Sequence, residues 1–249
     1  EVARLKNNVS ESALRERMGG NPPLRDFGQS LSLAGGPRII AEVKKSSPSE
    51  GPIDLEAQAG AVASQYQAGG AAAISVLVDT SFFGGSYEDL ELVKKAVDLP
   101  VLCKEFIIDK IQILRAAAAG ADSVLLIAAI LTPSHLNALL DYTHDLGMQA
   151  LVEVHDRQEL EKARTVNPAI IGINNRNLKT MKTNLETTIS LAEEVDPGVI
   201  LVSESGISSH EDLVRLSEAG VRAFLIGTSL MRATDRTRAV KALITGEPS

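Results

Sequence analysis

The feature that most constrains this chain is an alternation, repeated eight times, between a short apolar run and an amphipathic stretch of helical length. Runs rich in Val, Ile, Leu and Ala are typical of strands buried on both faces, as in a parallel sheet covered by helices. We predict strands at 38–43, 72–78, 100–106, 122–128, 149–154, 169–174, 199–205 and 222–227. We predict helices at 54–68, 87–97, 110–119, 133–146, 157–166, 185–195, 210–219 and 229–243.

Eight strand–helix units in 249 residues predict a closed (β/α)8 TIM barrel, an α/β fold. An open, doubly wound sheet is the alternative. No Gly-x-Gly-x-x-Gly follows the first strand, however, and no strand has the weaker apolar pattern of a sheet edge. Three predicted helices end at AGG, AGA and AGV, where Gly can form a left-handed cap before the next strand.

The first 36 residues differ in pattern from the repeats. Ser10 followed by ESALRERM predicts a short capped helix, and LRDFGQSLS indicates another. We therefore predict a helical extension over residues 1–36 and a single barrel domain over residues 37–249.

Composition excludes several classes of protein. Hydrophobic residues make up 44% of the chain and charged residues 23%, as in ordinary globular proteins. No apolar run reaches the roughly 18 residues that span a bilayer, and no signal sequence opens the chain, so we expect a cytoplasmic protein. The single cysteine, Cys103, excludes an internal disulfide. The net charge of −7 argues against nucleic acid or an anionic membrane as a partner, and no obligate protein partner is evident.

Polar side chains gather at the predicted carboxyl ends of the strands, where barrels place their chemistry. Glu42 and Lys44 end the first strand on the same face, because they are two residues apart. Later strand ends contribute Lys104, Phe106, Glu153, Asn174, Arg176, Glu204, Ser205, Gly227 and Thr228. One charged strand end is most often a solvated terminus, but six polar ends out of eight predict a shared active site.

Lys104 and Glu153 are the candidates for acid–base chemistry. If both face the barrel mouth, they could act as general acid and general base on one substrate. A plain buried salt bridge is the structural alternative. Cys103 should point away from Lys104, toward the helices, which indicates a core residue and not a nucleophile.

Two loops near the end of the chain predict a phosphate site for a small phosphorylated substrate. Ser205 and Gly206 follow the seventh strand, and Gly227 and Thr228 follow the eighth. Exposed backbone N–H groups at these loops commonly bind phosphate in barrels. Each Gly alone could be a turn residue, but the two loops together favour phosphate. Ser47 is ambiguous between turn formation and ligand contact.

No metal site is predicted. The histidines show no metal-ligand spacing, and surface or helix-cap roles suit them: His135, His144, His155 and His210. No zinc motif, P-loop or serine-nucleophile elbow is present.

The sequence resembles the indole-3-glycerol phosphate synthase family, through matching stretches between about residues 38 and 232. These are IIAEVKKSSPS, FFGGSYEDL, PVLCKEFIID, GADSVLLIAAIL, LVEVHD, IGINNRNL, LVSESGI and LIGTSLMR. The first 36 residues resemble the family's helical N-terminal segment, which lies over the barrel mouth. The resemblance implies a carboxy-lyase of tryptophan biosynthesis that uses no cofactor. Its reaction converts 1-(2-carboxyphenylamino)-1-deoxyribulose 5-phosphate to indole-3-glycerol phosphate, with loss of CO₂ and water.

Residue roles also follow from the resemblance. It implies that Lys104 is the general acid for the ribulose carbonyl, that Glu153 acts in dehydration, and that Lys44 lies near the departing carboxylate. Glu42 and Glu204 would position these groups and the sugar hydroxyls. The remaining implied contacts are Asn174 and Arg176 to polar parts of the substrate, Phe106 to its aromatic ring, and Ser47, Ser205, Gly206, Gly227 and Thr228 to its phosphate.

Three residues depart from the usual family pattern, namely Val78, Glu105 and Asn177, but none carries an implied chemical role. Two alternatives remain. A phosphoribosylanthranilate isomerase would be expected to use an early cysteine base, whereas the first strand here offers Glu42 and Lys44. A catalytically idle or engineered phosphate-binding barrel scaffold is the alternative of a different class.

Overall fold

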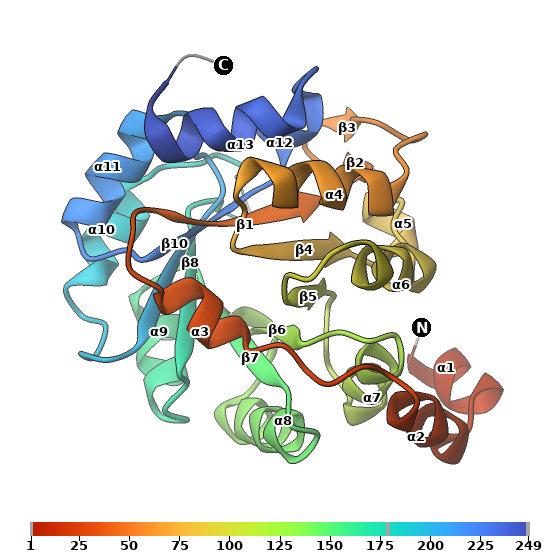
Figure 1. Ribbon diagram of the computed structural model, residues 1–249. Helices are drawn as coiled ribbons and strands as arrows, with labels where there is room; N and C mark the ends of the chain where they lie inside the picture. Colours follow the sequence, from red (N-terminus) through yellow and green to blue (C-terminus); the bar gives the residue numbers. More distant parts are fainter. Residues whose placement is uncertain (1, 178–179, 248–249) are drawn as a thin grey trace.

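All eight predicted strands form, and they close into one parallel barrel ringed by helices (Figure 1). The computed structural model describes residues 2–177 and 180–247. The barrel strands are β1 (Arg38–Val43), β4 (Ala73–Leu77), β5 (Val101–Lys104), β6 (Ser123–Ile127), β7 (Gln149–Val154), β8 (Ile170–Asn174), β9 (Ile200–Glu204) and β10 (Ala223–Ile226). The strands neighbour one another in chain order, and β10 pairs with β1 to close the barrel.

The predicted helices also form, except that the last one, predicted at 229–243, is divided into two. They are α4 (Ala59–Gly69), α6 (Tyr87–Ala96), α7 (Lys110–Ala118), α8 (Pro133–Asp145), α9 (Arg157–Arg164), α10 (Glu186–Ala192), α11 (His210–Glu218), α12 (Thr228–Arg232) and α13 (Arg236–Thr245). The predicted helix at 229–243 is thus two helices. Asp235 separates them, because its side chain caps α13 by accepting a hydrogen bond from the Arg238 N–H.

Four short elements in the loops were not predicted: β2 (Ser46–Ser47), β3 (Gly51–Pro52), α5 (Thr80–Phe83) and the 3₁₀ turn η1 (Ala128–Ile130). Among the described residues, no helix combines the length and apolarity needed to cross a bilayer.

Alternate strand residues build two separate apolar layers. In β1, Ile39 and Ala41 pack between the strands and the helices, whereas Ile40 packs inside the barrel. Cys103 is fully buried in the outer layer, which confirms its predicted direction. The next residue, Lys104, therefore points into the barrel.

The N-terminal extension contains three helices: α1 (Val2–Asn8), α2 (Glu11–Gly19) and α3 (Phe27–Ser32). The capped helix at ESALRERM is confirmed, since the Ser10 hydroxyl accepts a hydrogen bond from the Ala13 N–H at 3.2 Å. The sequence did not reveal α1. Both α1 and α2 pack against α7, with Leu5 and Leu14 buried beside Leu114.

The third helix closes the amino-terminal end of the barrel. Phe27 and Leu31 are fully buried among the inward side chains of the strands, and the Gly28 N–H donates to Gln149 at the start of β7 (2.8 Å). This end is opposite to the mouth, so the expected position over the mouth is wrong for α3. Phe27 and Leu31 form an apolar helix face that needs a buried site, and the inward strand side chains at this end of the barrel provide that site.

Shortening the Phe27 side chain, which fills the amino-terminal end of the barrel, should destabilise the whole barrel. We expect Phe27→Ala to lower the free energy of unfolding by about 3–5 kcal/mol, because the lost side chain leaves a cavity in the core. Urea denaturation followed by circular dichroism measures the change. The control is Leu33→Ala, because the Leu33 side chain is exposed. Equal urea midpoints for the two variants would show that Phe27 does not stabilise the barrel by filling this end.

Candidate active site

A cavity of about 650 Å³ opens at the carboxyl-terminal ends of the barrel strands. Its walls contain every predicted site residue except Glu204, which is fully buried and reaches Lys104 from β9. The predicted residues at the cavity wall are Glu42, Lys44, Ser47, Lys104, Phe106, Glu153, Asn174, Arg176, Ser205, Gly206, Gly227 and Thr228. The structure thus brings the predicted strand ends into one site.

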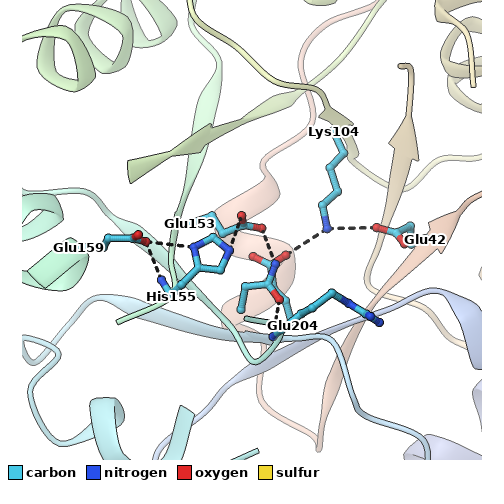
Figure 2. Close-up of polar contacts among 8 residues, drawn as sticks. Glu42, Lys104, Glu153, His155, Glu159 and Glu204 are labelled. Carbon is cyan, nitrogen blue, oxygen red and sulfur yellow. Dashed lines mark hydrogen bonds and ion pairs between the residues drawn. The ribbon is translucent and has the colours of Figure 1, made fainter. Parts of the chain in front are cut away.

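Lys104 lies at the centre of this site, between two carboxylates (Figure 2). Its Nζ is 3.1 Å from Glu42 Oε2 and 3.1 Å from Glu204 Oε2. Burial alone would lower the pKa of Lys104, but the charges of Glu42, Glu204 and Glu153 outweigh burial and raise the pKa above its ordinary value. Lys104 is therefore an ammonium ion at neutral pH, with protons available for donation.

Glu42 binds both lysines of the site at once. Its Oε1 is 2.9 Å from Lys44 Nζ, and its other oxygen contacts Lys104. Burial acts to raise the pKa of Glu42, but the two ammonium groups outweigh it and hold the pKa at about 2. Glu42 thus remains ionised at neutral pH, which suits a residue that positions the lysines better than one that carries a proton.

The pKa of Glu204 is shifted in the direction opposite to that of Glu42. Burial raises its pKa to about 8, although Lys104 opposes the shift, and the nearby charge of Glu153 adds to it. Gly172 in β8 leaves the room that this carboxyl group occupies, since a Cβ there would lie 2.2 Å from Glu204 Oε1. The glycine in IIGIN is therefore a packing requirement of the site.

Glu153 is held from two sides. Its Oε2 accepts a hydrogen bond from Asn174 Nδ2 at 3.2 Å, and its Oε1 lies 3.4 Å from His155 Nε2. The other ring nitrogen of His155 lies 3.0 Å from Glu159 Oε2 (Figure 2). The expectation of a surface or helix-cap role for His155 is wrong. Its spacing of two residues from Glu153, which puts both on one face of extended chain, was the available signal.

One wall of the cavity is aromatic. The ring centroid of Phe106 lies 6.4 Å from that of Phe82 and 6.3 Å from that of Phe83. The sequence predicted only Phe106, because the other two lie in the unpredicted helix α5. Phe82 and Phe106 are largely exposed toward the cavity, which gives a surface suited to a flat apolar ring.

The opposite wall is formed by the loops after β9 and β10. Ser205 and Gly206 both have left-handed backbone conformations, with φ of 68° and 79°. The buried Asn175 supports this turn by donating to the Ser205 carbonyl oxygen at 3.1 Å and to the Ser203 hydroxyl at 3.0 Å. Such support explains how a non-glycine residue keeps a strained conformation here.

Gly227 and Thr228 complete this wall at the start of α12. A Cβ on Gly227 would lie 2.3 Å from Glu42 Oε1, so this glycine also makes room for the Glu42–Lys44 pair. Arg232 lies on the same wall and was not predicted; it pairs with Glu50 at 2.8 Å. The signal for Arg232 was its place one helical turn after Thr228.

Two further predicted residues make contacts within loops at the mouth. The Ser47 hydroxyl accepts a hydrogen bond from the Glu50 N–H at 3.2 Å, so its turn role is present while the residue also lines the cavity. Arg176 lines the cavity and donates from Nη1 to the Met181 carbonyl oxygen at 3.2 Å. Within residues 2–177 and 180–247, no group of three or more His, Cys, Asp or Glu side chains is arranged to hold a metal ion.

Comparisons with known proteins identify the family of this chain. The family model described as indole-3-glycerol phosphate synthase matches residues 1–243. The chain is 45% identical to the indole-3-glycerol phosphate synthases of Crocosphaera subtropica and Desulfosudis oleivorans; each match covers 98% of this chain, with 85% and 93% of the relatives. A thiamine phosphate pyrophosphorylase from Pyrococcus furiosus shares the fold, with a TM-score of 0.63 at 16% identity over 88% of this chain and 96% of that one. The chain therefore belongs to the indole-3-glycerol phosphate synthase family.

Proposed function

We propose that this protein converts 1-(2-carboxyphenylamino)-1-deoxyribulose 5-phosphate to indole-3-glycerol phosphate in tryptophan biosynthesis, releasing CO₂ and water. The observation that carries the proposal is the buried Lys104 ammonium, held by Glu42 and Glu204 at the base of a cavity with one aromatic wall and one phosphate-type wall. The substrate has the matching groups, since it joins a phenyl ring to a phosphorylated sugar through a reactive carbonyl.

In this proposal, Lys104 donates a proton to the ribulose carbonyl oxygen as the ring carbon that bears the carboxylate attacks the carbonyl carbon. The Lys44 ammonium, held by Glu42, lies near the carboxylate and orients it as the carbon–carbon bond breaks to release CO₂. Asn174 holds Glu153, which then serves the proton transfers of dehydration. Glu204 keeps Lys104 directed at the substrate.

Substrate binding is divided between the walls of the cavity. Phe106, with Phe82 and Phe83, packs against the phenyl ring, while Arg176 contacts polar groups of the substrate. The phosphate is bound by backbone N–H groups and hydroxyls of the loops after β9 and β10, because such groups form a ready anion site. The residues assigned to the phosphate are Ser47, Ser205, Gly206, Gly227 and Thr228, and Arg232 lies beside them.

A direct assay tests the function. The protein is incubated with the carboxyphenylamino-deoxyribulose phosphate, and indole absorbance and fluorescence are followed. The chain contains no Trp, so its own fluorescence background is low. Formation of indole product with release of one CO₂ supports the proposal. Absence of product from the folded protein would instead favour a catalytically idle barrel.

Gly172 offers a test of the geometry around Lys104. Ala at this position should push the Glu204 carboxyl group away, because the new Cβ would lie 2.2 Å from it. We expect Gly172→Ala to reduce kcat by roughly 10²-fold, since displacement of a positioning group by about 1 Å has effects of that size. The control is Gly19→Ala, where a Cβ meets no atom within 4 Å. Equal kcat values would show that Glu204 does not position the reacting groups.

A further inference from the structure

The proposed reaction consumes one proton in each turnover. The carbonyl oxygen leaves as water and so takes up two protons, while the methylene group beside the nitrogen releases one as the indole ring forms. The carboxylate departs as CO₂ without carrying a proton. The site must therefore obtain one net proton from solvent for every product molecule.

The acid–base groups of the site are poorly placed to obtain that proton directly. The Glu153 side chain is only 4% exposed, and Lys104 is held between two buried carboxylates. A substrate bound in the cavity would cover the mouth above them. A route that brings protons to Glu153 from another side of the barrel would therefore support turnover.

We propose that Glu159, His155 and Glu153 form a proton relay that crosses the barrel wall from solvent to the active site. The proposal rests on the function proposed above. Side-chain exposure falls along the three residues, from 17% at Glu159 to 9% at His155 and 4% at Glu153. Glu159 belongs to α9 in the outer ring, and Glu153 belongs to β7, so the imidazole bridges the two layers (Figure 2).

The geometry of His155 suits this role, because each ring nitrogen faces one carboxylate. Nδ1 lies 3.0 Å from Glu159 Oε2, and Nε2 lies 3.4 Å from Glu153 Oε1. A proton from Glu159 binds at Nδ1 to give the imidazolium, and the Nε2 proton then leaves for Glu153, so that one proton crosses the ring. Tautomer exchange, in which the ring loses its Nδ1 proton and regains one at Nε2, restores the starting arrangement before the next turnover. Contacts of this kind in a free enzyme often shorten when substrate binds.

The charges around the imidazole favour its proton-carrying form. Glu159 also accepts a hydrogen bond from the His155 backbone N–H at 2.8 Å, which fixes that carboxylate beside the ring. Burial would lower the pKa of His155, but the hydrogen bond to Glu159 and the charges of Glu153, Glu159 and Glu204 outweigh it and raise the pKa. The protonated ring is thus more populated near neutral pH than in a free histidine.

The test compares His155→Asn and Glu159→Gln with wild type, with His144→Asn as the control because His144 is exposed on α8. We expect both relay variants to lose about tenfold to a hundredfold in kcat, with KM changed by less than about twofold, because the relay acts on proton transfer and not on binding. Added imidazole should restore much of the lost kcat in His155→Asn and leave wild type and the control unchanged. A merely structural role would not give this rescue.

Two results would overturn the relay: a wild-type kcat in His155→Asn, or a loss of kcat that imidazole does not restore. If His155→Asn does not fold, Glu159→Gln decides by itself, and a wild-type kcat in that variant overturns the relay. A folded wild type that makes no indole product is a different outcome, because it contradicts the proposed function.

Discussion

Lys104→Ala is expected to lower kcat for indole formation by about 10²- to 10⁴-fold, the usual effect of removing a positioned general acid. The variant loses the Lys104 ammonium group, which contacts both Glu42 and Glu204. Because carbonyl protonation accompanies the first bond-forming step, the release of CO₂ should fall by the same factor as indole formation. Stopped-flow fluorescence and trapped labelled CO₂ measure the two events.

Two further variants separate proton donation from charge. Lys104→Arg keeps a cation, but a guanidinium does not readily give up a proton, so it should recover little activity. Lys95→Ala removes an exposed lysine from α6 and should leave kcat unchanged. Near-wild-type turnover in Lys104→Ala would refute the assignment of Lys104 as the general acid.

Glu153→Gln is expected to have the second large effect, about 10²- to 10⁴-fold on kcat, but at a later step. The amide oxygen can still accept the hydrogen bond from Asn174, so the substitution removes proton exchange while keeping most of the packing. In a single turnover, CO₂ should therefore appear before indole, because dehydration becomes slow. The ratio of the two rates distinguishes this variant from Lys104→Ala.

Glu161→Gln in α9 provides the matched control, since Glu161 is exposed. It should release CO₂ and indole together, as wild type does. If Glu153→Gln also released the two products together at the wild-type rate, Glu153 would have no part in dehydration.

Much of the fold follows from local pattern. Each barrel strand is short, apolar and bounded by turn residues, and the inside–outside alternation correctly placed Cys103 against the helices and Lys104 inside the barrel. The break between α12 and α13 was missed because a single capping residue, Asp235, outweighs an otherwise helical pattern. The site of α3 was also missed, since an apolar helix face does not reveal which end of a barrel it will cover.

The candidate site, like the fold, could be predicted from the sequence in part. Strand ends could be predicted because a closed parallel barrel brings all of them to one end. Phe82, Phe83 and Arg232 were missed because they lie in short helices that approach the mouth only in the folded chain. His155 was missed because its partner Glu159 comes from another layer of the barrel.

The sequence by itself determined the eight-fold order of strands and helices, the end of the barrel that carries chemistry, and the residue types gathered there. Only the tertiary structure decided the direction in which the pKa of each of these residues is shifted. Glu42 and Glu204 have the same side chain, yet two lysines hold the pKa of Glu42 at about 2, while burial raises that of Glu204 to about 8. The reason is physical: an ionisation equilibrium depends on desolvation and on charges a few ångströms away, and these are set by contacts between strands that lie far apart in the chain.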